Sequence, residues 1–243
     1  RVTVRAVRLA APLRLDGQLD EAVYASVPPM SGFIQNDPAE GAPATEKTEV
    51  WLFFDRDHLY IVARCWETHP ERRVANEMRR DNTAIVRNDN FAWSFDTFYD
   101  RRNAVIFEVS AIGGRLDGQV TNEQQVNTDW NPVWDVKVGR FEGGWTMEAA
   151  VPFKSLIPLS EVIAELNGFP VFSKKTWQVY NALIEKFGNE FNVLLDAAEE
   201  ELKKVVDEKL AAAIMKNREG KIKVKPGYDG VYGKPILNGS SKG

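Results

Sequence analysis

The chain has 243 residues, enough for one large domain or two smaller ones, with 44% hydrophobic and 27% charged residues. This is an ordinary globular composition, and no apolar run reaches the roughly eighteen residues that a membrane-spanning helix needs. The net charge of −4 indicates neither a polyanionic partner nor a membrane surface, and the single cysteine, Cys65, excludes an internal disulfide. With only two histidines, a metal site built from soft ligands is not expected.

Residues 1–157 carry the pattern of an antiparallel β protein. Two apolar runs on either side of the turn at 55–58 predict a first hairpin. Apolar residues alternate with polar or small ones in 91–95 and 105–109, which predicts a second hairpin. The same alternation in 134–138 and 145–149 predicts a third hairpin. Strands with turn signals at this spacing predict a two-sheet sandwich rather than a parallel α/β fold.

The same residues carry a resemblance to a known family. The strings that carry it are, in chain order, LRLDGQLDEAVYASVPP, FIQNDPAEGAPATEKTEVWLFFDRDHLYI, SFDTFYDRRNAVIFEVSAIGG, DWNPVW and GGWTMEAAVPFKSL. Together they resemble the family 9 carbohydrate-binding-module-like domain of bacterial cell-envelope proteins, over residues 5–157. The resemblance implies a jelly-roll-like antiparallel β-sandwich, no catalysis, an exported setting, and sugar held between aromatic rings.

Aromatic side chains on loops are the candidates for holding a sugar, because the C–H face of a sugar stacks on an indole. Trp130 lies in a polar segment and is the preferred platform, with a cap over the end of the sandwich as the alternative. Trp93 and Trp134 alternate with strand residues and are expected in the core. The further glycan candidates are Trp66, Asp129, Asn131, Arg101, Arg102 and Asn103. The alternative for residues 101–103 is a solvated hairpin turn.

Carboxylates in this part allow two other interpretations. Asp96 and Asp100 flank a turn at a spacing that suits calcium, although such aspartates more often cap backbone amides. A glycosidase needs two carboxylates across a cleft, and nothing in the spacing of Asp96, Glu108, Asp129 and Glu148 selects a pair. We therefore expect no catalysis and no cofactor other than calcium.

Residues 158–243 carry helical patterns instead. Ser160 is expected to cap a helix that ends at Asn167-Gly168, and Ser173 a second helix that ends at Gly188. Further helices are expected at 199–206 and 207–216, besides a short early one at 20–26. A small α-helical domain is therefore predicted after the sandwich.

This region resembles the C-terminal end of archaeal endonuclease Q, a DNA-repair nuclease, over residues 156–236. The strings SKKTWQVYNALIEKFGNEFNVLL and AAAIMKNREGKIKVKPGYDGVYGKP carry the resemblance. It implies a helix-hairpin-helix-like part that assists DNA binding, while the metal-bearing catalytic domain of that family has no counterpart here. Because residues 158–243 contain no histidine, we expect no nuclease activity from them.

Two segments are candidates for weak nucleic-acid binding. The hairpin from Gly168 to Lys175 offers a glycine, a capped helix N-terminus at Ser173, and the charges of Lys174 and Lys175. Lys221, Lys223 and Lys225 alternate along one predicted strand and could follow a phosphate backbone, with a solvated strand as the alternative. The second hairpin position, Val206-Asp207-Glu208, has no glycine and two carboxylates, which disfavours phosphate.

The charged residues differ between the two parts. Residues 1–157 have 15 Arg and 3 Lys against 23 acidic residues, whereas residues 158–243 have 1 Arg and 12 Lys against 12. Folding rarely demands one basic residue over the other on a solvated surface, so this switch indicates two genetic origins. We interpret the chain as a chimera of two domains, 1–157 and 158–243, without a joint function. A scaffold with neither ligand is the remaining alternative, and the compartment, sugar and oligomeric state are left open.

Overall fold

The computed structural model describes residues 4–97, 101–121, 125–128, 130–153, 157–171, 173–190, 192–219, 223–225 and 234–236. The fold is mainly β, with two sheets in the first part of the chain and helices in the last, as the sequence predicted. Within these ranges, no helix has the length and apolar character needed to cross a bilayer.

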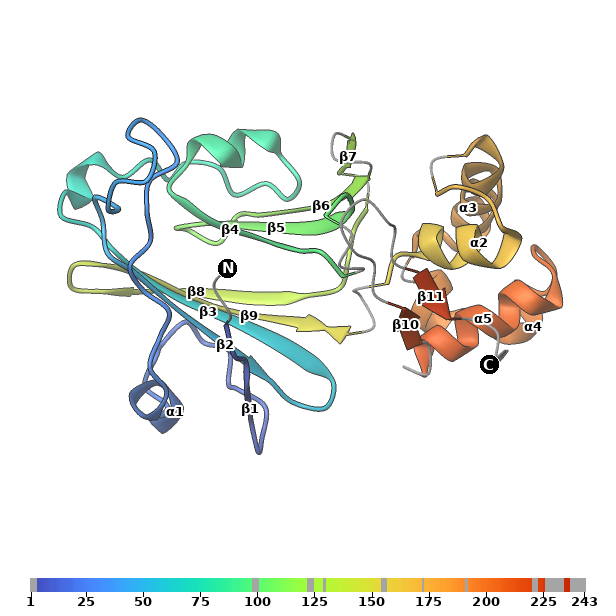
Figure 1. The fold of residues 1–243 in the computed structure, drawn as a ribbon, viewed down its shortest axis with the longest axis horizontal. Helices are drawn as coiled ribbons and strands as arrows, with labels where there is room; N and C mark the ends of the chain where they lie inside the picture. The colour runs from blue at the N-terminus through green and yellow to red at the C-terminus, as the bar shows by residue number, and fades with distance from the viewer. Residues whose placement is uncertain are drawn as a thin grey trace. The chain divides into compact units, whose positions relative to one another are not determined.

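The first sheet has five strands in the order β1-β2-β3-β9-β8 (Figure 1). The strands are β1 (Val7–Arg8), β2 (Thr48–Phe54), β3 (His58–Trp66), β9 (Gly144–Pro152) and β8 (Asp135–Phe141). All neighbours are antiparallel except β1 and β2. The first and third predicted hairpins are confirmed: β2 pairs with β3 around the turn at 55–57, and β8 pairs with β9 around Glu142-Gly143.

The second sheet has four strands in the order β4-β5-β6-β7. They are β4 (Asn90–Phe95), β5 (Ala104–Ser110), β6 (Arg115–Thr121) and β7 (Gln125–Asn127). The β4–β5 pair is the second predicted hairpin. Trp93 stacks on Phe107 of the neighbouring strand with ring centroids 5.4 Å apart, a cross-strand aromatic pair that stabilises the sheet.

One face of the five-stranded sheet is covered by the N-terminal segment. Its buried residues are Tyr24, Trp51, Phe53, Tyr60, Val62 and Ala150, packed against apolar side chains of residues 7–27. The short helix α1 (Ala22–Ser26), expected at 20–26, contributes Tyr24, whose ring meets that of Trp51 edge-on at 5.7 Å. This part of the face is thus core, while the part at Arg64 and Trp66 is partly exposed.

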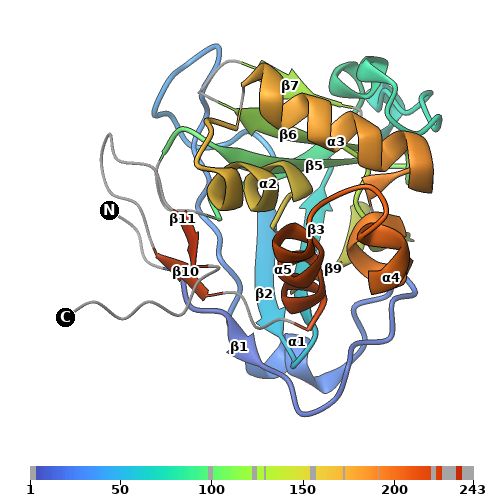
Figure 2. The same ribbon diagram turned by 90° about the vertical axis from the view of Figure 1, so that its right-hand side faces the viewer.

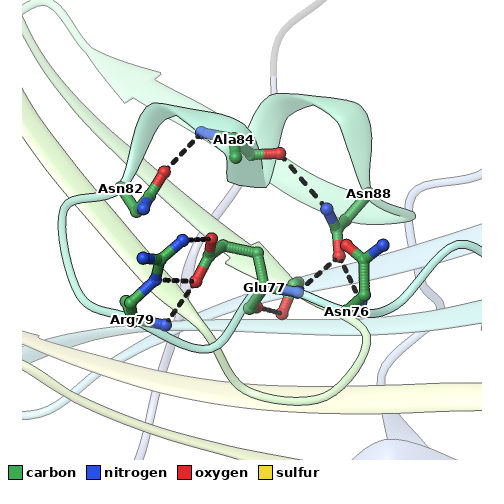
Figure 3. Close-up of polar contacts among 7 residues, drawn as sticks. Asn76, Glu77, Arg79, Asn82, Ala84 and Asn88 are labelled. Carbon is green, nitrogen blue, oxygen red and sulfur yellow. Dashed lines mark hydrogen bonds and ion pairs between the residues drawn. The ribbon is translucent and has the colours of Figure 1, made fainter.

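Side-chain hydrogen bonds order the loop between β3 and β4 (Figure 3). This loop contains the short 3-10 helices η1 (Pro70–Arg72) and η2 (Thr83–Arg87). Asn88 accepts from the amides of Asn76 and Glu77 at 2.7 and 3.0 Å. The Arg79 guanidinium, together with the Arg79 amide, lowers the pKa of the Glu77 carboxyl to about 2. The loop is therefore held by its own side chains rather than by strand pairing.

The C-terminal elements build a second hydrophobic core. They are α2 (Leu159–Asn167), α3 (Lys174–Phe187), the π-helix η4 (Asn192–Asp196), α4 (Glu199–Leu202), α5 (Glu208–Arg218), and the two-stranded pair β10 (Lys223–Lys225) and β11 (Lys234–Ile236). In Figure 2, α2 lies between α3 and α5, and Leu159, Ile163, Leu183 and Ile214 are fully buried among them. The predicted cap at Ser173 is confirmed, and Asp207, where a helix was expected to begin, caps α5; each side chain accepts from the amide three residues on.

Two helix predictions need correction. Ser160 does not cap α2, because the N-cap is Pro158 and Ser160 is buried, where its hydroxyl accepts from Gln119 at 3.3 Å. The Leu159 amide, at the first position of α2, donates to the Glu190 carboxylate at 2.6 Å. The helix expected at 199–206 ends at Leu202, after which turns continue to 205.

Contacts divide the chain differently from the predicted boundary at residue 157. One compact unit comprises residues 1–92, 108–116 and 134–152, and the other comprises 93–107, 117–133 and 153–243. Strand β6 from residue 117 onward and the helices share the second unit, as the Gln119–Ser160 hydrogen bond illustrates. The division into domains 1–157 and 158–243 stays a prediction.

Candidate functional site

Strand register places four side chains together on the face of the five-stranded sheet that the N-terminal segment partly covers. In β3 and β9, Arg64 pairs with Thr146 and Trp66 with Gly144, and Gly144 in turn pairs with Phe141 of β8. Because side chains alternate along a strand and directly paired residues share a face, Arg64, Trp66, Thr146 and Phe141 point to the same side. They come from segments about eighty residues apart in the sequence.

These side chains form the floor of an open cavity of about 490 Å³. The turn at residues 17–20 forms its wall. The lining residues are Gly17, Gln18, Leu19, Asp20, Arg64, Trp66, Arg140, Phe141, Glu142 and Thr146. Arg140 has the opposite strand parity to Phe141, and its guanidinium donates to the Ala111 carbonyl at 3.2 Å, so it is not counted among the groups that face a ligand.

Trp66 is the aromatic centre of this cavity. It is partly exposed, and the Phe141 ring meets it edge-on with centroids 5.6 Å apart. Lys47 Nζ lies 4.3 Å and Arg64 Cζ 5.7 Å from the centroid of the indole, at distances suited to cation–π attraction. The Glu49 carboxylate holds both cations, at 2.7 Å from Lys47 and 3.7 Å from Arg64. The indole is thus fixed in place by its neighbours.

Two side chains of β9, those of Glu148 and Thr146, hold the wall of the cavity in place. The buried Glu148 carboxylate accepts from the amides of Asp16 and Gly17 at 3.0 and 2.8 Å and from the Tyr24 hydroxyl at 2.6 Å. Thr146 donates to the Gly17 carbonyl at 2.6 Å. Burial raises the pKa of the Glu148 carboxyl, and the three donors oppose that shift.

The expectation that Trp130 offers an exposed platform is wrong. Its side chain is 1% exposed, its ring meets Phe107 edge-on at 5.9 Å, and its indole hydrogen-bonds the Glu190 carboxylate. A buried ring agrees with the alternative interpretation, in which Trp130 covers an end of the sandwich instead of binding a ligand. Asn131 beside it is exposed, and Asp129 lies outside the described residues.

The turn between β4 and β5 agrees in part with the alternative interpretation, that of a solvated turn whose aspartates cap backbone amides. Asp96 accepts from the Arg101 amide at 2.7 Å, so its carboxylate caps the backbone. Arg101 is exposed, Arg102 and Asn103 are partly buried, and Asp100 lies outside the described residues. In the part of the chain that the structure describes, no group of three or more His, Cys, Asp or Glu side chains could hold a metal ion.

The described nucleic-acid candidates lie at the start of α3 and in β10. Gly168 ends α2 in the left-handed conformation with φ 65°, and Ser173 caps α3. Lys174 and Lys175 are exposed, and Lys175 Nζ lies 4.8 Å from the Phe169 ring centroid. Lys223 and Lys225 occupy β10, and Lys221 lies outside the described residues.

Glu190 is a buried carboxyl that the sequence did not single out. It is 4% exposed and accepts from the Leu159 amide at 2.6 Å and the Tyr180 hydroxyl at 2.8 Å. Burial raises its pKa to about 7, although these donors and the Trp130 indole favour the charged form. A lone Glu in a helical sequence reads as a surface residue, so only its spatial surroundings reveal it.

Comparisons of sequence match the C-terminal part. Residues 158–221 match the family described as the MJ0043 C-terminal domain. The chain is 41% identical over 83 residues to the uncharacterized protein MJ0043 of Methanocaldococcus jannaschii, covering 34% of this chain and 10% of that protein. It is 52% identical over 52 residues to the uncharacterized protein YqxK of Bacillus subtilis, covering 21% and 13%. The chain thus spans about a tenth of the length of these relatives.

Comparisons of structure find both resemblances. A family 9 carbohydrate-binding module from Caldicellulosiruptor kristjanssonii, in complex with glucose, is similar over 61% of this chain and 68% of that one, with 16% identity and a TM-score of 0.44. The lesion-specific endonuclease PfuEndoQ from Pyrococcus furiosus is similar over 33% of this chain and 20% of that one, with 36% identity and a TM-score of 0.29.

Proposed function

We propose that the β part of this chain binds carbohydrate without catalysis, at the cavity lined by Trp66. The observation that carries the proposal is a partly exposed indole, held by Phe141 and two cations, in the floor of an open cavity of about 490 Å³. An indole offers a sugar ring an apolar surface, while the hydroxyls need polar partners around its edge. Besides Arg140, which pairs with the Ala111 carbonyl, the polar residues of this lining are Arg64, Thr146, Gln18, Asp20 and Glu142.

The size of the cavity also suits this class of ligand. Small-molecule sites usually occupy about 300–1,000 Å³ and combine aromatic walls with a few placed polar groups. The lining here has both signs of charge, with Arg64 and Arg140 among the basic residues and Asp20 and Glu142 among the acidic ones. A neutral, polyhydroxylated ligand can use donors and acceptors of both kinds without leaving one charge unpaired.

Glycan binding of the whole chain tests the proposal. Wild type should retain specific glycans on an array, and Trp66→Ala should weaken binding of the best ligand at least tenfold in calorimetry. Phe33→Ala, which removes a partly exposed ring elsewhere on the first unit, is the matched control and should bind as wild type does. Equal affinity of Trp66→Ala and wild type would place the sugar elsewhere or nowhere.

A second candidate function, weak binding of DNA, belongs to residues 158–243. The specific observation is the pair of exposed lysines, Lys174 and Lys175, at the capped N-terminus of α3 just after the Gly168 turn. Backbone amides and the helix dipole favour a phosphate at such a position, and the lysines add a screened attraction. A gel shift of the tail at about 50 mM salt tests it, because phosphate contacts weaken steeply as salt rises.

The control for that experiment removes the same charge elsewhere. Lys174→Gln with Lys175→Gln should abolish the shift, whereas Lys203→Gln with Lys204→Gln, on lysines that already pair with Glu199, Glu200 and Glu201, should leave it unchanged. If the two double variants behave alike, the attraction is a general effect of charge rather than a site.

We infer further that the two parts act separately. Expressing residues 1–157 and 158–243 as separate proteins tests both this inference and the predicted boundary. Two folded products, each with the ligand behaviour of the whole chain, would support it. Insolubility of either product would argue for one shared unit, and the absence of glycan and DNA binding would leave a scaffold.

A further inference from the structure

The wall of the Trp66 cavity is a turn that is not itself part of a strand. Residues 17–20 line the cavity, yet they lie between the first strand and α1 rather than in a sheet. A turn of this kind is usually mobile unless its backbone groups have fixed partners. The shape of the cavity therefore depends on whatever anchors this turn.

Glu148 is that anchor. It lies in β9 with its side chain fully buried, and one of its oxygens, Oε2, accepts from two successive backbone amides, those of Asp16 and Gly17. The other oxygen, Oε1, meets the Tyr24 hydroxyl at 2.6 Å. Thr146, two residues before Glu148 on the same face of β9, donates to the Gly17 carbonyl and also lines the cavity.

We propose that Glu148 is a positioning residue for ligand binding: it touches no ligand but fixes the turn at residues 16–18, and so sets the distance between the wall and the Trp66 floor. This proposal rests on the carbohydrate-binding function proposed above. The floor is rigid because its residues lie in paired strands, so the turn is the variable part of the cavity. If the turn is released from Glu148, the affinity for the ligand falls, because part of the binding free energy must then be used to order the turn.

The hydrogen-bond pattern predicts which substitutions keep the wall in place. Glutamine has the shape of glutamate; its carbonyl oxygen can accept from both amides, and its NH2 can donate to the Tyr24 oxygen, since a phenol hydroxyl is donor and acceptor alike. Leucine fills a similar volume and accepts nothing, so the Asp16 and Gly17 amides lose their partner. Glu148→Gln should therefore behave as wild type, and Glu148→Leu should not.

The test measures affinity and the wall independently on the full chain. In calorimetry with the best glycan from the array, Glu148→Gln should bind within about twofold of wild type and Glu148→Leu roughly tenfold or more weakly. Hydrogen exchange should show faster exchange of the Asp16 and Gly17 amides in Glu148→Leu, with the β3 and β9 amides still protected. Glu108→Leu, which removes another buried carboxyl of the first unit, is the control and should change neither readout.

Each outcome decides a point. If Glu148→Leu binds as tightly as wild type, or Glu148→Gln binds as weakly as Glu148→Leu, the positioning role is overturned. If Glu148→Leu does not fold, Glu148→Asp keeps the carboxylate but withdraws it by one methylene from the Asp16 and Gly17 amides, and unchanged affinity and exchange in that variant overturn the proposal. If wild type binds no glycan, the proposed function fails, whereas slow Gly17 exchange in Glu148→Leu refutes Glu148 as the anchor whether or not a sugar binds.

Discussion

Gly17 and Gly139 pass each other so closely that neither position has room for a side chain. A Cβ on Gly17 would lie 2.6 Å from the Gly139 nitrogen, and a Cβ on Gly139 would lie 1.9 Å from the Gly17 carbonyl oxygen. The turn that forms the wall of the Trp66 cavity thus rests directly on the backbone of β8. This contact, with the Glu148 hydrogen bonds, explains how a short N-terminal turn is held on the sheet.

Gly17→Ala should therefore destabilise the chain through both strain and overlap. Gly17 has φ 81°, where an L-residue costs about 1–2 kcal/mol, and the overlap with backbone adds about 1–3 kcal/mol. Gly41→Ala is the matched control, because Gly41 has φ 79° and a Cβ there would meet nothing within 4 Å. Chemical denaturation measures the difference. Equal losses in the two variants would show that the turn can lift off β8 freely.

Trp130 should contribute stability rather than affinity. Its side chain is buried against Phe107, so Trp130→Ala should lower the free energy of unfolding by about 3–5 kcal/mol, as other large-to-small core changes do. Trp130→Phe keeps most of the apolar area but removes the hydrogen bond to Glu190, and should cost less. Thermal unfolding monitored by circular dichroism measures both. A stable Trp130→Ala protein that loses glycan binding would restore the platform interpretation.

Arg218 should hold the π-helix through its guanidinium. It donates to the carbonyls of Val193, Leu194 and Ala197 at 3.2, 3.0 and 2.7 Å, and burial lowers its pKa. Arg218→Met keeps the apolar stem but leaves these carbonyls without their donor, at a cost of about 2–3 kcal/mol. Lys216→Met, at an exposed position two residues earlier, should be neutral in the same urea titration. Similar losses in both would attribute the effect to charge alone.

Local pattern predicted most elements of this fold, and the misses have a common physical cause. The hairpin turns and the caps at Ser173 and Asp207 depend on residues close in sequence, so the sequence could predict them. The side-chain acceptor at the start of α2 could not be predicted in this way, because Glu190, which accepts from the Leu159 amide, lies 31 residues further on. A local rule assigned that role to Ser160, whose hydroxyl is instead used by Gln119.

The candidate site shows the same limit. Trp66 was predicted as one candidate among several, but its neighbours Arg64, Thr146 and Phe141 join it only through strand register. Trp130 was preferred because polar residues surround it in sequence, yet side chains that are distant along the chain, Phe107 and Glu190, bury it. Polarity of sequence neighbours indicates a loop; it does not indicate whether an indole within that loop is exposed.

Glu190 should make the stability of the chain depend on pH below neutrality. Its pKa rises from 4.5 to about 7 on folding, so the neutral form is favoured in the folded state. Its contribution to the free energy of unfolding is therefore full below about pH 4.5 and is lost as pH rises through about 7, by an amount on the order of 3 kcal/mol. Glu190→Gln cannot ionise and should lack this step.

The measurement is the difference in stability between wild type and Glu190→Gln in urea titrations at pH 4.5, 5.5, 6.5 and 8. A difference is needed because Glu108 and Glu148 also have raised pKa values and shift stability in the same direction. A difference that stays constant across this range would mean that the Leu159 amide, the Tyr180 hydroxyl and the Trp130 indole stabilise the charged form enough to cancel the cost of burial.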